Sequence, residues 1–217
     1  MDEKISEMTK NSHYTIDDLL DIMKILRSPE GCPWDREQTH RSIRRDLLEE
    51  AYEVADAIDR GNPEALCEEL GDLLLQVVFH SQISAEVGEF DFSDAVDGVC
   101  RKMILRHPHV FGDVSADTTD EVLSNWDAIK RLEKDIKSPG EELDAVARTL
   151  PALMRAAKRS AKCRKLGVDS GAKSSDLSAE ELGGELFSLA ARAKELGLDP
   201  EKLLSDYCDS LISAEKG

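Results

Sequence analysis

The segment LLEEAYEVADAIDRGNPEALCEELGDLLLQVVF, residues 47–79, decides the fold of this chain. Apolar residues recur in it at helical spacing, first up to Ile58 and again from Leu66 onward. Between them, Gly61-Asn62-Pro63 places a glycine just past one helix, an asparagine at an N-cap and a proline at the first helical position. Such a short turn makes the two helices antiparallel neighbours. The segment predicts a helical hairpin whose arms run from Thr39 or Ser42 to Arg60 and from Pro63 to about Val87.

The second arm of this hairpin carries apolar residues on two opposite sides. Leu70, Leu74 and Val77 belong to one side, and Leu75 and Phe79 belong to the other. A helix that is apolar all round is typical of a buried position. We therefore expect this helix to be buried on nearly all sides.

Outward from the hairpin, similar patterns predict further helices and no strands. Thr15 is expected to cap a helix that ends near Arg27, and Thr118 and Glu121 form the capping box of a helix that ends near Ile136. Helices are also expected from Ser93 or Asp94 to Arg106, over 148–165, and in two short stretches near the C-terminus. Prolines and glycines predict loops at 28–35, 106–118 and 167–175. The expected fold class is all-α.

Charge and composition exclude several classes of protein. The chain has 217 residues with 45 acids and 28 bases, a formal net charge of −17 and a pI near 4.7. Such acidity argues against stable binding to nucleic acids or to anionic membranes. No apolar run reaches the roughly 18–20 residues of a membrane span, and the chain has neither a P-loop nor a G-x-G-x-x-G turn. The excess acid is therefore either plain surface charge or, in part, a site for metal ions.

The N-terminal residues and the cysteines indicate the cellular compartment. The first ten residues, MDEKISEMTK, are polar and acidic, so we expect no secretory signal. The five cysteines are odd in number, widely spaced and without a C-x-x-C pair. This usage is typical of reduced thiols and argues against a zinc ribbon or a disulfide framework. We expect a cytoplasmic protein.

Acidic residues at helical spacing occur on both arms of the hairpin. The first arm carries Glu49, Glu50 and Glu53, and the second carries Glu69 and Asp72. Residues three apart share a helix face, so the two acidic groups can face each other across the hairpin. Such carboxylates repel one another unless protonated or neutralised, and oxygen ligands suit Mg²⁺, with Mn²⁺ as the alternative ion. The competing interpretation is that they are ordinary exposed acids.

A di-iron bundle is the rival metal interpretation, and the sequence argues against it. Ferritin-like sites need Glu-x-x-His on two helices. The chain has one such pair, Glu37 and His40, at the edge of a loop.

The motif Glu-Glu-Leu-Gly occurs twice, at Glu68–Gly71 and again at Glu180–Gly183, 112 positions later. Both copies lead into an apolar helix, a glycine and an acidic restart. This echo indicates two related halves, of which the second is shorter.

Taken in order, the motifs resemble the MazG family of nucleoside triphosphate pyrophosphohydrolases. The resemblance is strong over about residues 15–170 and weak over 176–213. It rests on the motifs GCPWDxxQTH (31–40), EExxE (49–53), ELGD (69–72), RHPHVF (106–111) and LPALxRAxK (150–158). The ordered series is specific to the family, whereas acidic pairs alone are not.

The resemblance implies a four-helix-type all-α module that hydrolyses nucleoside triphosphates to monophosphate and pyrophosphate, by attack of water at the α-phosphorus. In it, Mg²⁺ would be held by Glu50, Glu53, Glu69 and Asp72. Glu49 or Glu53 would orient or deprotonate the water, and the sequence does not choose between them. Arg106 and Lys130 match basic positions near the phosphates, with catalytic and substrate-binding roles. The resemblance also implies a homodimer.

Two residues of the GCPWDxxQTH motif have open roles. Trp34 either plugs the core or packs as a lid on the hairpin, or else it stacks on a nucleobase, as aromatic faces can. His40 either contacts the substrate or bonds backbone.

The second half departs from the fuller family pattern. No E-E-x-x-E helix precedes Glu180; the segment is short and contains Ser170, Ser174, Ser175 and Ser178, and Gly184 stands where an aspartate would complete E-L-G-D. We expect this half to be inactive and to serve packing or dimerisation. The expected division is a catalytic domain at 1–137, a linker at 138–147, and a basic connecting helix with a degenerate repeat at 148–217.

The basic helix at 148–165 carries seven bases and no acids. It could be a nucleic-acid stripe, a membrane-surface helix or a structural helix laid against the acidic body. Its Ala-rich stripe has no Trp or Phe of the kind that anchors interfacial helices, which favours the structural role.

Two other functions compete with broad triphosphate hydrolysis. One is a non-catalytic interaction or regulatory protein of the same fold. The other is a specialised house-cleaning enzyme for dUTP or dCTP. An inactive interaction protein should have lost acidic residues from the first group, so the complete set there argues against that function. A panel of nucleoside triphosphates would distinguish a specialised dUTP or dCTP hydrolase from a broad one.

Overall fold

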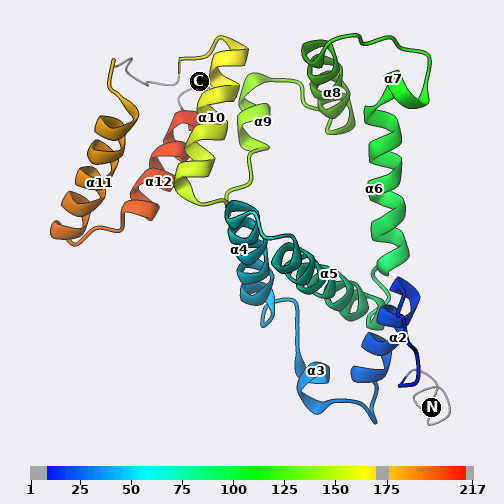
Figure 1. Cartoon of the computed structure of the whole chain (residues 1–217). Coiled ribbons are helices and arrows are strands. Elements are labelled where there is room, and N and C mark those ends of the chain that lie inside the picture. The colour runs from blue at the N-terminus through cyan, green and yellow to red at the C-terminus, as the bar shows by residue number, and fades with distance from the viewer. Residues whose placement is uncertain (1–8, 170–175, 214–217) are drawn as a thin grey trace. The chain divides into compact units, whose positions relative to one another are not determined.

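The computed structural model describes residues 9–169 and 176–213, and these residues form eleven helices and no strand (Figure 1). The all-α prediction is confirmed. The polar residues 1–8 and most of the Ser-containing segment, 170–175, lie outside the described residues.

The chain divides into two compact units, residues 1–105 and 106–217, each described here by itself. This boundary differs from the predicted one at 137–148, and the predicted division stays a prediction. The first unit contains α2 (Ile16–Leu26), α3 (Pro33–Glu37), α4 (Arg44–Arg60), α5 (Pro63–Glu86) and nearly all of α6 (Phe92–Arg106). The second contains α7 (Pro108–Phe111), α8 (Thr119–Glu133), α9 (Pro139–Asp144), α10 (Ala152–Leu166), α11 (Ala179–Glu195) and α12 (Pro200–Ser213).

The helix boundaries follow the capping residues. Thr15 and Thr118 each form a capping box, with Asp18 and Glu121 as the returning acids. In each box the threonine side chain accepts a backbone N–H of the first turn, which would otherwise lack a partner. Both predicted helix starts are confirmed.

Three short helices occupy segments that we expected to be loop or linker. α3, α7 and α9 begin at Pro33, Pro108 and Pro139, each at the first helical position. A proline there fixes φ near its helical value and sacrifices no intrahelical hydrogen bond. As loop signals alone, these prolines did not predict the short helices that they start.

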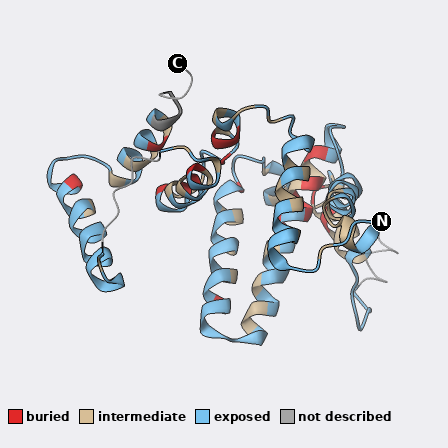
Figure 2. Cartoon of the chain, turned by 90° about the horizontal axis from the view of Figure 1, so that it is seen from above, coloured by how far each residue is buried: buried red, intermediate tan, exposed pale blue. Residues whose placement is uncertain are grey.

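The core of the first unit lies where α2 and α4 meet α5. Met23, Ile43, Val78 and Phe79 are buried together, and five partly buried apolar residues pack against them. The other buried residues of this unit are Arg27, Ala57 of α4, and Gln76, Ser81 and Ser84 of α5; buried residues are red in Figure 2. Burial in this unit therefore concentrates at the end of α5 that follows its acidic residues.

The expectation that α5 is buried on nearly all sides is wrong within this chain. Leu70, Leu74 and Val77 are 49%, 39% and 41% exposed. The side that carries Leu75 and Phe79 packs on the core, whereas no described helix covers the other side to the same extent.

The second unit has a core that includes charged side chains. Ala152, Arg155, Arg159 and Cys163 are the buried residues of α10, and this helix packs against α9 and α12. The Arg155 guanidinium donates to the Ser205 side chain at 2.9 Å and to Asp209 at 2.5 Å. The packing of α10 supports the structural interpretation of the basic helix.

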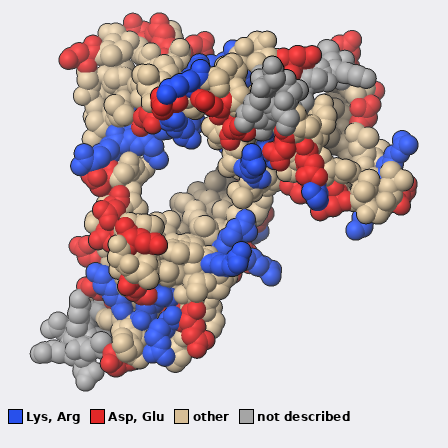
Figure 3. All heavy atoms as spheres, turned by 180° about the vertical axis from the view of Figure 1, so that it is seen from behind, with Lys and Arg blue, Asp and Glu red and all other residues tan. Residues whose placement is uncertain are grey.

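No helix in the described parts of the chain combines the length and the apolar character that a bilayer crossing requires. Acidic and basic side chains are interspersed over the face shown in Figure 3, and Lys and Arg also form compact groups of their own there.

Candidate functional site

The turn between α4 and α5 sets the geometry of the site. Gly61 takes a left-handed conformation with φ 63°, which a glycine adopts without the steric cost of a side chain. The Asn62 side chain then accepts the N–H groups of Glu64 and Ala65 at 3.1 and 3.2 Å and starts α5. The predicted helix stop and restart are confirmed, and α4 packs along α5 (Figure 1).

The acidic residues stand at matching distances from this turn. Glu53 precedes Gly61 by eight residues and Glu69 follows it by eight, while Glu50 and Asp72 stand eleven residues away on either side. Helical rise is the same along both arms, so matched positions of an antiparallel hairpin lie at the same level.

Three of the four predicted metal ligands meet in space. Carboxylate oxygens of Glu50, Glu69 and Asp72 all lie within 4.8 Å of one another. Glu50 and Glu69 are half-buried, whereas Asp72 is exposed. Several hard oxygen donors at this density fit a divalent cation such as Mg²⁺, which binds through a few carboxylates and keeps some of its water. We call these three residues the carboxylate cluster.

Electrostatics within the hairpin also fit a bound cation. Partial burial, followed by the charges of Asp72, Glu53, Glu69 and Glu49, raises the pKa of Glu50. Burial and the charges of Glu53, Glu68 and Asp72 likewise raise the pKa of Glu69, and Arg60 opposes the shift. Like charges held this close destabilise each other's ionised forms, and a cation would relieve that repulsion.

The remaining two acids of the predicted set lie beside the cluster. Glu53 is exposed and is not one of the three converging residues, but its charge acts on both Glu50 and Glu69. Glu49 points to a more open position; its side chain is 55% exposed and lies 3.8 Å from Arg45.

The segment that carries Trp34 is anchored by Arg27, a residue that the sequence argument did not single out. The buried Arg27 guanidinium binds both carboxylate oxygens of Glu86 at 2.7 Å. It also donates to the carbonyl oxygens of Asp35 at 2.5 Å and Gln38 at 3.2 Å. Arg27 continues the apolar stripe of Leu20 and Met23, and a lone charge in that register is the signal that could have identified it.

Gly31 permits the close approach of the same segment to α2. A β-carbon at Gly31 would lie 2.1 Å from the carbonyl oxygen of Ile25 and 2.3 Å from that of Leu26. No side chain fits there, so this position requires glycine. Trp34 itself is 60% exposed, which excludes the role of a core plug and leaves its ring open to stacking.

His40 is tied to α5 by two other side chains that sequence reasoning missed, His80 and Ser84. The His40 and His80 rings stack with centroids 5.1 Å apart, and their Nδ1 atoms lie 2.7 Å apart. The other ring nitrogen of His40 lies 3.1 Å from Ser84 Oγ. Gln76, His80 and Ser84 recur every four residues on an apolar helix, and this polar row was the available signal.

Arg106 and Lys130 belong to the second unit, where Arg106 forms an aromatic and ionic group. Its guanidinium binds Glu133 at 2.5 and 2.7 Å and lies 5.5 Å from the ring centre of Trp126. His107 meets the same ring edge-on at 4.9 Å. Lys130 is half-buried, and burial together with the charges of Lys162, Lys134 and Arg106 lowers its pKa.

The second Glu-Glu-Leu-Gly copy lies at the start of a helix. Ser178 caps α11, and Glu181 returns to accept the Ser178 backbone N–H at 2.8 Å. In the described residues, the carboxylate cluster of the hairpin is the one group of three potential metal ligands.

Comparison with known proteins locates the same segments. The model of the MazG nucleotide pyrophosphohydrolase domain matches residues 38–111, which include α4, α5 and α6. A nucleoside triphosphate pyrophosphohydrolase of Escherichia coli K12 is 51% identical over 155 residues, or 71% of this chain. The match spans only 59% of the length of the Escherichia coli protein.

Two proteins of Thermotoga maritima are also similar. One, named nucleoside triphosphate pyrophosphohydrolase/pyrophosphatase MazG, is 38% identical over 213 residues, which cover 90% of this chain and 82% of the relative. The other is the crystal structure of a mazG-related protein, with 26% identity and a TM-score of 0.46 over 54% of this chain and 99% of that one. Identity of this extent to a relative covered over most of its length shows that the chain belongs to the MazG family.

Proposed function

We propose that this protein hydrolyses nucleoside triphosphates to a nucleoside monophosphate and pyrophosphate, with Mg²⁺ as the cation. The observation that carries the proposal is the convergence of Glu50, Glu69 and Asp72 on the α4–α5 hairpin of a MazG family member. The names of the Escherichia coli and Thermotoga maritima relatives supply the reaction.

The residues have separate tasks in this proposal. Glu50, Glu69 and Asp72, with Glu53 beside them, would hold the cation. A bound divalent ion supplies charge neutralisation for the triphosphate and for the charge that develops when water attacks the α-phosphorus. Glu49 or Glu53, both exposed beside the carboxylate cluster, would accept the proton of that water.

The other residues would act on the substrate. Arg106 and Lys130 would contact phosphate oxygens, since a guanidinium and an ammonium are the usual donors to phosphate. Trp34 presents an exposed ring that can stack on a base. His40 would contact the substrate, and its own contacts with His80 and Ser84 would hold its ring in place.

A homodimer is part of the proposal, and the exposed side of α5 supports it. Leu70, Leu74 and Val77 form an apolar row along that side, and Tyr52 and Ile58 of α4 are also more than half exposed. Contiguous exposed apolar side chains favour association. Light scattering after size exclusion should give twice the chain mass, and Leu74→Lys should shift the protein toward monomer.

The second half is proposed to serve packing or dimerisation without catalysis. Binding of nucleic acids and membranes is not part of the proposed function, and the cytoplasm remains the predicted location.

The decisive experiment incubates the full-length protein with Mg²⁺ and each ribo- and deoxyribonucleoside triphosphate, and identifies the products by ³¹P NMR. Monophosphate and pyrophosphate are expected. Orthophosphate with diphosphate would contradict attack at the α-phosphorus. Turnover of dUTP or dCTP alone would assign the specialised house-cleaning function.

Glu50→Gln serves as the inactive variant, because it removes one charged ligand while keeping nearly the same shape. Glu180→Gln is its matched control in the second half. No turnover by the wild-type protein with any nucleotide would favour a non-catalytic interaction protein.

A further inference from the structure

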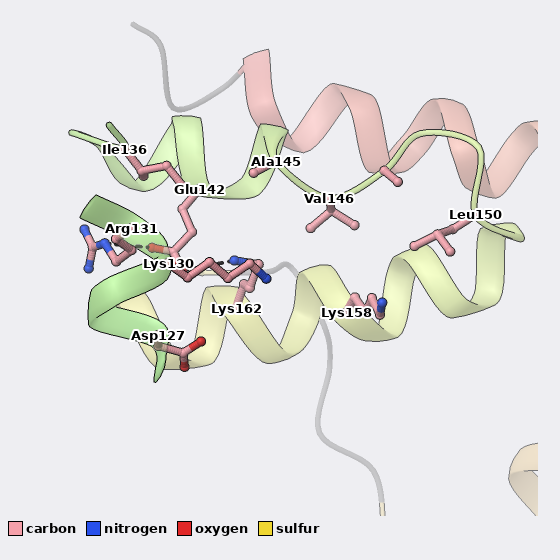
Figure 4. Close-up of a pocket in the computed structure, with 11 residues that line it drawn as sticks. Asp127, Lys130, Arg131, Ile136, Glu142, Ala145, Val146, Leu150, Lys158 and Lys162 are labelled. Atoms are coloured by element: carbon pink, nitrogen blue, oxygen red, sulfur yellow. Dashed lines mark hydrogen bonds and ion pairs between the residues drawn. The ribbon is translucent and has the colours of Figure 1, made fainter. Parts of the chain in front are cut away.

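A cavity of about 230 Å³ lies within the second unit, where α8, α9 and α10 meet. Its lining includes four bases, Lys130, Arg131, Lys158 and Lys162, and two acids, Asp127 and Glu142. Figure 4 shows Lys158 and Lys162 on α10 below the segment that carries Val146 and Leu150. The bases therefore surround a space that has an apolar wall on one side.

Both acids of the lining are ion-paired, Glu142 with two bases of the lining itself and Asp127 with a base outside it. The buried Glu142 carboxylate lies 3.0 Å from the Lys162 ammonium and 3.3 Å from Arg131 Nε. Asp127 pairs with Lys165, which does not line the cavity. In the described parts of the chain, neither Lys130 nor Lys158 has a carboxylate within ion-pair distance. The cavity thus carries positive charge that the protein does not neutralise.

Positive charge concentrated in a cavity attracts anions. The Lys130 ammonium lies where burial and neighbouring cations disfavour its charge, and an anion beside it would reverse that effect. A concave, partly apolar wall limits screening by water, so the field is stronger there than at the open surface. This region contrasts with a chain whose net charge is −17.

We propose that this cavity binds a phosphate chain, either free pyrophosphate or the phosphates of a nucleotide, through Lys130, Lys158 and Lys162 and without a divalent cation. The cavity shares no residue with the carboxylate cluster. Lys130, which the proposed function assigns to substrate phosphate, would make that contact here, so for this residue the inference rests on the proposed function.

The ligand chemistry follows from the donors. Several ammonium groups around one space favour an anion with several charges, and each lysine provides a compact charge with three N–H donors for phosphate oxygens. A carboxylate cluster needs a cation before it can accept a polyphosphate, whereas a lysine cavity does not. The two sites therefore have opposite metal requirements, and removal of metal separates them.

The test titrates the full-length protein with sodium pyrophosphate in EDTA, using isothermal titration calorimetry at low ionic strength. We expect saturable binding that weakens with added salt, because exposed charges are screened. Lys158→Ala should weaken binding roughly three- to tenfold through loss of one charged contact. Lys158 is exposed and lacks an ion pair among the described residues, so its removal should leave folding intact.

Lys202→Ala is the matched control, because Lys202 is an exposed lysine of α12 that pairs with Asp206 outside the cavity. Its affinity should equal that of the wild type. Glu69→Gln should also bind pyrophosphate normally in EDTA, since the cluster takes no part.

Parallel titrations with ATP and AMP distinguish the ligand sources. Tighter binding of ATP than of pyrophosphate would assign the cavity to the phosphates of a nucleotide, and the reverse order would assign it to the free anion; both support the site. Absence of pyrophosphate binding in EDTA, or equal affinities in wild type and Lys158→Ala, would overturn it. Neither of these two results bears on Mg²⁺-dependent hydrolysis, which is measured separately.

Discussion

The two copies of Glu-Glu-Leu-Gly have the same letters and opposite surroundings. In α5 the motif begins five residues after the first helical residue, Pro63, so Glu69 stands inside the helix and faces Glu50 across the hairpin. In α11 it begins one residue after Ala179, so Glu181 stands in the first turn and caps the helix with Ser178.

The difference appears in the carboxylates themselves. Burial and nearby acids raise the pKa of Glu69, whereas hydrogen bonds from Ser178 lower the pKa of Glu181. In α5 the neighbouring carboxylates repel Glu69, and a bound cation would relieve that repulsion. In α11 hydrogen bonds within the capping box stabilise the charge of Glu181. The same short acidic motif can therefore contribute to a cluster of carboxylates only where it lies inside a helix and an acidic helix packs against it.

The largest expected effect is on turnover. Glu69→Gln should lower the rate of triphosphate hydrolysis by at least about 100-fold, because it removes a charged ligand from the site of reaction. Glu181→Gln should leave the rate within about twofold and the melting temperature almost unchanged, because a glutamine at this position can also complete the capping box with Ser178. Steady-state assays and thermal melts on the two variants measure the rate and the stability. Equal rates in the two variants would contradict a functional difference between the two motif copies.

Two buried arginines extend the contrast between the units. Arg27 holds the Trp34 segment, and Arg155 holds α12 through Ser205 and Asp209. Replacing either by alanine should lower the free energy of unfolding by about 2–4 kcal/mol, below the full value for a buried pair because each acidic partner is at least a third exposed.

Only Arg27→Ala should also reduce turnover by the folded protein, since it frees the segment near the proposed base contact. Urea titrations give the stabilities, and assays at a temperature where both variants are folded give the rates. Arg27→Lys keeps the charge but not the forked donors, so it should recover little. Normal turnover by folded Arg27→Ala would remove the Trp34 segment from the reaction.

Acid should destabilise the two units in different pH ranges. Burial and the His40 charge lower the pKa of His80 from its usual 6.5, so the unfolded chain binds this proton first and stability falls as pH drops through 6.5. A hydrogen bond from Arg155 lowers the pKa of Asp209 from 3.8, so its contribution is lost only below about that pH.

Urea midpoints at pH 7 and pH 5 should therefore differ less in His80→Gln than in wild type, while Asp209→Asn should leave that difference unchanged. The opposite pattern would place the pH sensitivity in the second unit.

The smallest effect concerns two helical glycines, Gly71 in α5 and Gly184 in α11. A β-carbon at either position meets no atom within 4 Å. Alanine should raise the free energy of unfolding by about 0.5–1 kcal/mol at both sites, through helix propensity alone. A gain in stability at Gly184 with a loss at Gly71 would instead indicate that a second copy of the chain covers α5 at Gly71.

The helix boundaries were predicted correctly where capping residues and turn residues determine them. Thr15, Thr118, Gly61 and Asn62 act within one helical turn, and all four behave as predicted. The short turn implies an antiparallel hairpin, and the hairpin implies that Glu50, Glu69 and Asp72 lie close together. The sequence therefore predicts this part of the site.

Contacts between distant segments were beyond the sequence argument. Arg27 lies 59 residues from Glu86, and His40 lies 40 residues from His80, so only the folded chain pairs them. The exposed side of α5 was missed for the same reason, since an apolar pattern does not say whether this chain or another covers it.

The hairpin has a final consequence for how such a protein can change over evolutionary time. All three converging carboxylates fall within residues 50–72, a single uninterrupted piece of chain. A duplication that copies this piece copies the whole ligand set, and a deletion of its first helix removes the chemistry in one step while the rest of the helical scaffold survives. A one-residue insertion at Asn62 would turn α5 by about 100° relative to α4 and disperse the ligands. Insertions or deletions in the tight turn are thus the changes that would most easily abolish the site.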